Sequence, residues 1–189
     1  MSVLVYTESD NGKFKKAALE VASYASAVAS QLGTTVTAVT FDADDASILG
    51  KYGVNKVLNI SNVSQFDEKN YAEALKQVSE SESAKVIILS SSADSKYLAP
   101  FLAIELDAAY ASNVVDVPSS MSPFTVKRTS FTNKAFNHTE LNSEVKIIGL
   151  SSNSFGLVEK DTSLTNEEFT ANVGESNVNV QSVDKATDQ

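Results

Sequence analysis

The sequence predicts an α/β fold, in which a mostly parallel, doubly wound sheet is flanked by helices and extended by antiparallel strands toward the C-terminal side. Two observations carry this prediction. Residues 84–117 combine a buried strand, a hydroxyl-rich loop, a helix and a second strand, which together form the repeating unit of a parallel α/β sheet. Within them, Val86–Leu89 is an apolar run without alternation, as expected of a strand that helices cover on both faces.

The first half of the chain shows the same succession of strands and helices. From Lys15 to Leu32 the apolar residues recur at helical spacing, and Gly33 stands where a C-terminal cap is expected. We predict strands at Val3–Tyr6, Val36–Phe41 and Lys56–Ile60, a short helix at Ala46–Tyr52 and an amphipathic helix at Asn70–Glu82.

A further helix is predicted over Ser95–Leu106, followed by a strand over Val114–Val117. Proline fits only the first turn of a helix without loss, so Pro100 indicates that this helix starts later than Ser95 or bends there. The side chains expected to face inward from this helix are Leu98, Phe101, Leu102 and Leu106. Aromatic residues such as Tyr24, Tyr97 and Phe101 are expected to pack in the core.

The pattern changes after Val117. Pro118–Pro123 is a connector rich in serine and proline. The next apolar and β-branched runs are separated by turns and not by helices, which predicts an antiparallel addition to the sheet. We place these strands at Thr125–Thr132, Lys134–Leu141 and Val145–Leu150.

Composition and charge exclude several classes of protein. The 189 residues carry a net charge of −9, and an acidic surface repels nucleic acid and anionic membranes. The absence of cysteine excludes disulfides and thiolate metal sites, and a single histidine leaves little for zinc, so no metal is expected. The chain has no run long enough to span a membrane and no signal-peptide pattern at its start, which predicts a cytoplasmic location.

The last part of the chain differs from the body. Residues 159–189 contain seven carboxylates and two lysines. The predicted organisation is therefore an α/β domain over 1–158 and an acidic polar tail over 159–189. A weak alternation at Val178, Val180 and Val183 leaves open whether the tail is a linker or a strand that awaits a partner.

The first place to look for function is the loop that follows Val86–Leu89, because ligands of α/β folds meet the carboxyl ends of the strands. Ser90, Ser91, Ser92 and Asp94 could bind a nucleotide phosphate, helped by the N-terminus of the following helix. The commoner alternative is a capped turn, in which Asp94 or Ser95 satisfies free N–H groups.

Other polar residues give weaker indications. Arg128, the single arginine, could clamp a carboxylate or a phosphate, or pair across a subunit interface, and a surface position is the alternative. His138 is expected at the surface. Glu8 and Asp10 follow the first strand and could form an acid/base pair, but nothing in the sequence brings a nucleophile to them. No catalytic residue is predicted.

Four segments together resemble the N-terminal domain of the electron transfer flavoprotein alpha subunit. They are VLVYTESDNGKFKKAALEVASYA, KYGVNKVLNI, SADSKYLAPFLAIELDAAYASNVVDV and VKRTSFTNKAF, and the resemblance covers roughly residues 3–155. None is diagnostic alone, and it is their order and spacing that make the resemblance specific. It implies a sheet like that of adenine-nucleotide alpha-hydrolase-like and universal stress proteins.

The resemblance also implies a function. Members of this family carry FAD on a second, C-terminal domain with glycine-rich loops, and none of the seven glycines here forms such a loop. The chain is therefore expected to be the part without flavin, with no cofactor-binding residue of its own and no enzymatic activity. The implied partners are the beta subunit and, through the full heterodimer, acyl-CoA dehydrogenases and a quinone reductase. The alternative is a stand-alone module that binds ATP or AMP.

Overall fold

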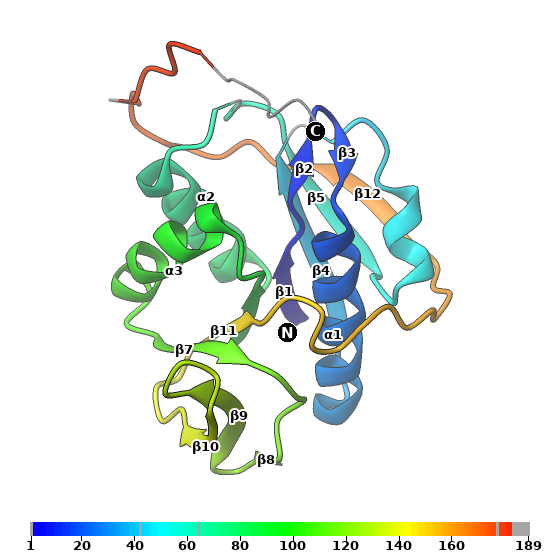
Figure 1. Ribbon diagram of the computed structural model, residues 1–189. Coiled ribbons are helices and arrows are strands. Elements are labelled where there is room, and N and C mark those ends of the chain that lie inside the picture. The colour runs from blue at the N-terminus through cyan, green and yellow to red at the C-terminus, as the bar shows by residue number, and fades with distance from the viewer. Residues whose placement is uncertain (1, 42, 64, 177, 183–189) are drawn as a thin grey trace, which may run out of the picture.

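A computed structural model describes residues 2–41, 43–63, 65–176 and 178–182 of the chain. It contains one ten-stranded sheet and four helical segments, and the predicted α/β class is confirmed (Figure 1). The helical segments are α1 (Lys16–Leu32), the 3-10 helix η1 (Ser47–Lys51), α2 (Glu68–Ser81) and α3 (Ala93–Glu105). The strands of the large sheet are β1 (Ser2–Tyr6), β4 (Thr35–Phe41), β5 (Lys56–Ile60), β6 (Val86–Leu89), β7 (Ala109–Val114), β8 (Ser120–Met121), β9 (Phe124–Ser130), β10 (Ala135–Glu140), β11 (Lys146–Leu150) and β12 (Thr165–Glu168).

Helices cover both faces of the parallel part of the sheet. Side chains of β1 alternate between two cores: Val3 and Val5 pack with α1 and η1, whereas Leu4 and Tyr6 pack with α2 and α3. Every side chain of β6 is buried, as the unalternating run Val86–Leu89 predicted. Burying each of these aliphatic side chains contributes about 1.5–3 kcal/mol relative to leaving it exposed.

The strand order creates a switch point between β1 and β6. The sheet runs β10-β9-β7-β11-β6-β1-β4-β5-β12, so the chain builds outward from β1 through β4 and β5, then returns to place β6 on the other side of β1. Beyond the carboxyl ends of β1 and β6 the two adjoining loops diverge. This is the position at which open α/β sheets bind ligands.

The antiparallel addition is smaller than predicted. β9 pairs with β10 in antiparallel register, but β11 lies between β6 and β7 and is parallel to both. The prediction that residues 145–150 extend the sheet as an antiparallel strand was therefore wrong. Ile147 and Ile148 are fully buried on opposite faces, which suits a central strand under two helical layers.

The second strand of the 84–117 unit also lies elsewhere than predicted. It is β7, which ends at Val114, the residue where the predicted strand was expected to begin. Asp107 adopts a left-handed conformation with φ 47°, which turns the chain out of α3 almost at once. The strand therefore starts at Ala109, and residues 115–117 follow it without belonging to it.

Helix α3 starts earlier than expected, at Ala93, so Pro100 lies in its interior. Proline has no N–H to donate to the carbonyl of Lys96, and both residues are on the exposed side, where water can reach that carbonyl. Leu98 and Leu102 are fully buried as predicted. Tyr97 and Phe101 were wrongly expected in the core, since they are 67% and 43% exposed.

Replacing Pro100 with alanine is expected to raise the free energy of unfolding by about 2 kcal/mol. The interior proline costs about 3 kcal/mol relative to alanine, of which up to about 1 is offset because proline stiffens the unfolded chain. Urea unfolding followed by circular dichroism measures the change. An alanine variant of unchanged or lower stability would contradict this expectation.

The acidic tail contributes a strand to the sheet. β12 pairs in parallel with β5, and Lys56 of β5 bonds to Glu167 of β12 at 3.1 Å. Further on, Asn62 and Ala171 exchange two hydrogen bonds, of 2.8 and 3.1 Å. Val178 and Val180 are exposed and outside any strand, and Val183 lies outside the described residues. The tail thus forms a strand at residues 165–168, and not at Val178 and Val180, whose alternation had suggested one. The boundary at residue 158 stays a prediction.

Candidate functional site at the switch point

Glu8 lies at the switch point, immediately beyond β1. The preceding residue fixes its position, because Thr7 donates both its backbone N–H and its hydroxyl to the carbonyl of Val39, at 2.9 and 3.1 Å. The carbonyl of Glu8 in turn accepts from the backbone of Lys15 at 3.3 Å. Its side chain is only 4% exposed and points to the end of β6.

Three serine hydroxyls donate to one oxygen of Glu8. The distances to Oε1 are 2.5 Å from Ser90, 2.7 Å from Ser92 and 2.8 Å from Ser95. Ser90 and Ser95 are themselves 5% and 1% exposed. The carboxylate of Glu8 thus occupies the place in the crevice where a bound anion would receive these same donors.

The remaining bonds of the serine loop are also internal. Ser92 is the N-cap of α3, because its Oγ accepts from the backbone N–H of Ser95 at 3.0 Å. Ser91 lies against the loop after β11, where its Oγ accepts from the backbone N–H of Ser152 at 3.1 Å. The capped-turn interpretation is confirmed, with Ser92 as the cap in place of Asp94 or Ser95.

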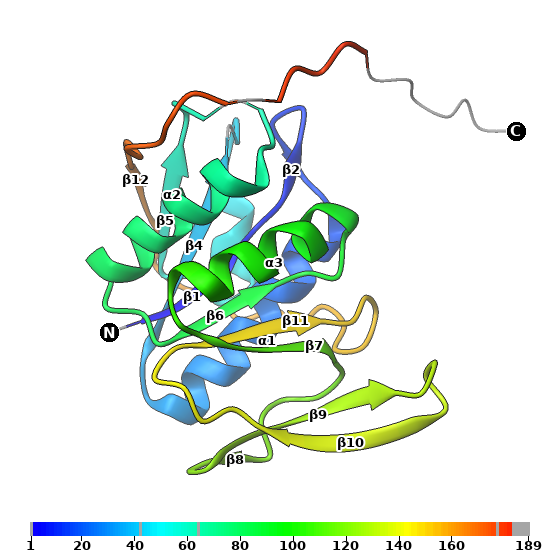
Figure 2. The same cartoon turned by 90° about the vertical axis from the view of Figure 1, so that its left-hand side faces the viewer.

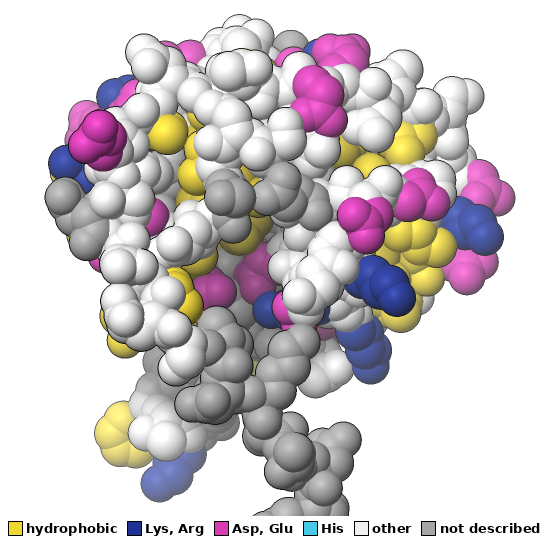
Figure 3. Space-filling model, turned by 90° about the horizontal axis from the view of Figure 1, so that it is seen from above, with side chains coloured by type: hydrophobic (Ala, Val, Ile, Leu, Met, Phe, Trp, Pro, Cys, Tyr) yellow, Lys and Arg dark blue, Asp and Glu magenta, His cyan; other side chains and the backbone are white. Residues whose placement is uncertain are grey.

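The electrostatics of this edge are unfavourable to a second anion. Partial burial raises the pKa of Asp94, and the negative charge of Glu8 raises it further, against a smaller opposite effect of Lys15. Figure 3 shows this end of the molecule from above, with acidic side chains both around and inside a central hollow. A phosphate brought to the serine loop would meet two carboxylates.

The structure does not bring Arg128 to the serine loop. Arg128 lies on β9, which β7 and β11 separate from β6, and its Nη2 donates to Ser112 of β7 at 2.9 Å. Within the described part of the chain, its buried Nε has no hydrogen-bond partner. Burial raises the pKa of the nearby Tyr110, which the positive charge of Arg128 partly opposes. His138 is exposed on β10, as predicted.

Glu8 and Asp10 do not form a pair. Asp10 is exposed in β2 (Ser9–Asp10), which pairs with β3 (Lys13–Phe14), and it bonds to its neighbour Asn11 at 2.7 Å. The hydrogen bonds between Glu8 and the serines could not be predicted from the sequence, because they join residues more than eighty positions apart. The sequence did contain one signal for this site. Glu8 is a carboxylate that follows the first buried strand by two residues, so it lies at the same sheet edge as the loop after β6.

A second buried carboxylate, Glu20 of α1, anchors the loop after β11. It accepts hydrogen bonds from the backbone N–H groups of Asn153 at 2.8 Å and of Phe155 and Gly156 at 3.0 Å each. Burial would raise the pKa of Glu20, but these bonds outweigh it, and the pKa is lowered. In the sequence Glu20 is indistinguishable from a solvated residue on the polar side of a helix.

Two further properties bear on the classes of function considered above. The described residues contain no group of three or more histidine, cysteine or carboxylate side chains placed to hold a metal ion. In the same part of the chain, no helix has both the length and the apolar character needed to cross a bilayer.

A comparison with protein families gives one match. The family model described as the electron transfer flavoprotein domain matches residues 3–181, which includes β12 and nearly all of the described chain. A search of curated proteins found no match. The match confirms the family to which the four sequence segments pointed, and it extends beyond them to the tail.

Proposed function

Since this chain belongs to the electron transfer flavoprotein family, we propose that it is the N-terminal domain of an alpha subunit and acts as a scaffold. In this role it supports a beta subunit and an FAD domain within a heterodimer. The complex carries electrons from acyl-CoA and related dehydrogenases toward a quinone reductase in the cytoplasm. The chain itself catalyses no reaction, because its share of the work is to position other parts.

The single observation that carries this proposal is that the hydrogen-bond donors at the switch point are already bound to a carboxylate of the chain itself. In a module that binds ATP or AMP, the serine hydroxyls and the N-terminus of α3 would be directed at a phosphate. Here Ser90, Ser92 and Ser95 all donate to the buried carboxylate of Glu8. This arrangement stabilises the fold and favours the scaffold over the stand-alone nucleotide-binding module.

FAD, the cofactor of this family, does not fit the described residues. Its pyrophosphate needs backbone N–H groups or cations, and the carboxylates of Glu8 and Asp94 border the serine loop. A hollow of about 330 Å³ between the β2–β3 hairpin and η1 is lined by two carboxylates, Asp44 and Asp45, against one ammonium group, that of Lys13, so its net charge is also unfavourable to phosphate. FAD is therefore proposed to bind elsewhere in the heterodimer, and no step on this chain is assigned to it.

Co-expression with a beta subunit from the same genome tests the proposal. The tagged chain is expected to retain the beta subunit through affinity purification and gel filtration. The chain purified alone is expected to be colourless, because its described residues offer no site for the isoalloxazine and pyrophosphate together. A yellow chain with stoichiometric FAD, or a chain that fails to retain the beta subunit, would overturn the proposal.

A further inference from the structure

The β9–β10 hairpin differs in charge from the rest of the protein. The chain carries 24 carboxylates and 15 basic residues, yet in the β9–β10 hairpin the one carboxylate is Glu140, the last residue of β10. The same hairpin contains Lys127, Arg128 and Lys134. The hairpin is therefore a basic segment on an acidic protein, and a surface of this kind attracts a partner of opposite charge.

One face of this hairpin has no covering layer. Val126 of β9 is fully buried in the core that α1 covers, so its neighbour Lys127 points to the opposite face of the strand. The register places Phe136 opposite Thr129 and His138 opposite Lys127 on that same face. We call these four side chains the hairpin face. Figure 2 shows that α3 covers the neighbouring part of the sheet on this side and that no helix lies over β9 and β10.

The hairpin exposes two phenylalanines. Phe136 on the hairpin face is 63% exposed, and Phe131 at the hairpin turn is 79% exposed. The ammonium group of Lys127 lies 4.6 Å from the ring centre of Phe136. Rings beside basic groups combine apolar contact area with charge, which is typical of residues that contribute most to protein interfaces.

The turn holds Phe131 at a conformational cost. Phe131, Thr132 and Asn133 all have positive φ, at 51°, 53° and 61°. A bulky residue is rarely found in the left-handed region, and here the ring is not buried in return. The outer edge of β10 also lacks a strand partner within the described residues, which leaves its backbone groups available.

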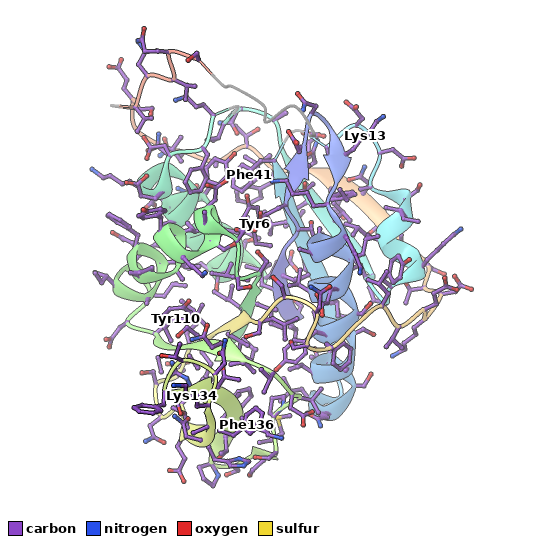
Figure 4. All side chains as sticks on the ribbon, viewed as in Figure 1. Tyr6, Lys13, Phe41, Tyr110, Lys134 and Phe136 are labelled. Atoms are coloured by element: carbon purple, nitrogen blue, oxygen red, sulfur yellow. The ribbon has the colours of Figure 1, made fainter. Side chains whose placement is uncertain are left out.

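We propose that the hairpin face, together with Phe131 and Lys134, docks an acidic surface of the partner subunit. This inference rests on the proposed function and specifies which part of the chain makes the contact. A partner polypeptide supplies both carboxylates for the basic groups and apolar side chains for the two rings. Figure 4 shows Lys134 and Phe136 at the end of the molecule opposite Lys13, so the docking surface lies far from the β2–β3 hairpin.

Binding of the full chain to the beta subunit from the same genome tests this assignment by biolayer interferometry. The charge-reversed variant Lys127→Glu/Lys134→Glu and the variant Phe131→Ser/Phe136→Ser are each expected to weaken binding by about tenfold or more. The matched control is Lys13→Glu/Lys51→Glu, which changes the net charge equally at two exposed lysines of other elements. This control is expected to bind like the original chain.

The original chain should also bind more weakly as salt is raised, because salt screens exposed charges. Circular dichroism should show unchanged folding, since the altered side chains lie at the surface.

If the original chain binds and both hairpin variants bind equally well, the docking assignment fails while the proposed function stands. Loss of binding in the control as well contradicts a contact confined to the hairpin. If the original chain does not bind the beta subunit, the proposed function itself fails. Self-association of the chain that the hairpin variants abolish would assign the face to a second copy and overturn the proposal.

Discussion

Replacing Glu20 with alanine is expected to lower the free energy of unfolding by about 3 kcal/mol at pH 7. The substitution leaves the backbone N–H groups of Asn153, Phe155 and Gly156 without their acceptor. An unsatisfied buried donor costs about 1–3 kcal/mol, and partial access of water to this loop reduces the sum. Urea unfolding of both proteins measures the loss.

The effect of Glu20 depends on pH in a defined direction. Its pKa is lowered in the folded protein, so its stabilisation is fully present above the unfolded carboxyl pKa of about 4.3 and is lost as pH falls through the folded value. The Glu20→Gln variant should therefore lose stability at pH 7 and approach the original chain as the pH falls below the ordinary carboxyl pKa and through the lowered folded one. Glu80→Gln on the exposed side of α2 is the control. A gap between Glu20→Gln and the original chain that stays constant with pH would contradict this account.

The second large effect is expected at the switch point. Glu8→Ala should destabilise the protein by about 2 kcal/mol, because three serine hydroxyls lose a charged acceptor. Two contributions limit the loss. The hydroxyls can rotate toward one another, as the 3.3 Å between the Oγ atoms of Ser90 and Ser95 allows, and Asp94 is relieved of a neighbouring negative charge. Thermal unfolding of the variant measures the net change.

Glu8→Gln separates the hydrogen bonds from the charge. Its side-chain carbonyl can accept from the same serines, so the variant should lie between Glu8→Ala and the original chain. Asp10→Asn is the matched control, because Asp10 is exposed and contacts only the adjacent Asn11 among the described hydrogen bonds. If Glu8→Ala were as stable as the Asp10→Asn control, Glu8 would not be an organising contact of the crevice.

Local pattern predicted those elements whose burial is visible in the sequence. The strands Lys56–Ile60 and Val86–Leu89 match β5 and β6 residue for residue, since an apolar run between polar turns has few alternatives. The position of β11 could not be predicted in this way. Its residues indicate a buried strand, but insertion between β6 and β7 is decided by tertiary packing.

The sequence predicted the position of the serine loop in the sheet, but not the carboxylate that its hydroxyls bind. Ser90, Ser91, Ser92 and Asp94 do lie at the carboxyl edge of the sheet, because they directly follow the strand Val86–Leu89. The contact of Glu8 with Ser90, Ser92 and Ser95 joins the ends of the first strand and of the fourth parallel strand along the chain, and no local pattern contains it. The exposure of Phe101 could not be predicted either. Both sides of α3 carry apolar residues, so the sequence does not indicate which side faces the core.

Calorimetric titration of the purified chain with AMP and with ATP tests the central claim most directly. The claim is that the carboxylate of Glu8 fills the crevice in which a nucleotide phosphate would bind. It predicts no heat beyond that of dilution for either nucleotide. Saturable heat with a dissociation constant in the micromolar range or tighter, on the order of −8 kcal/mol of binding free energy, would contradict it.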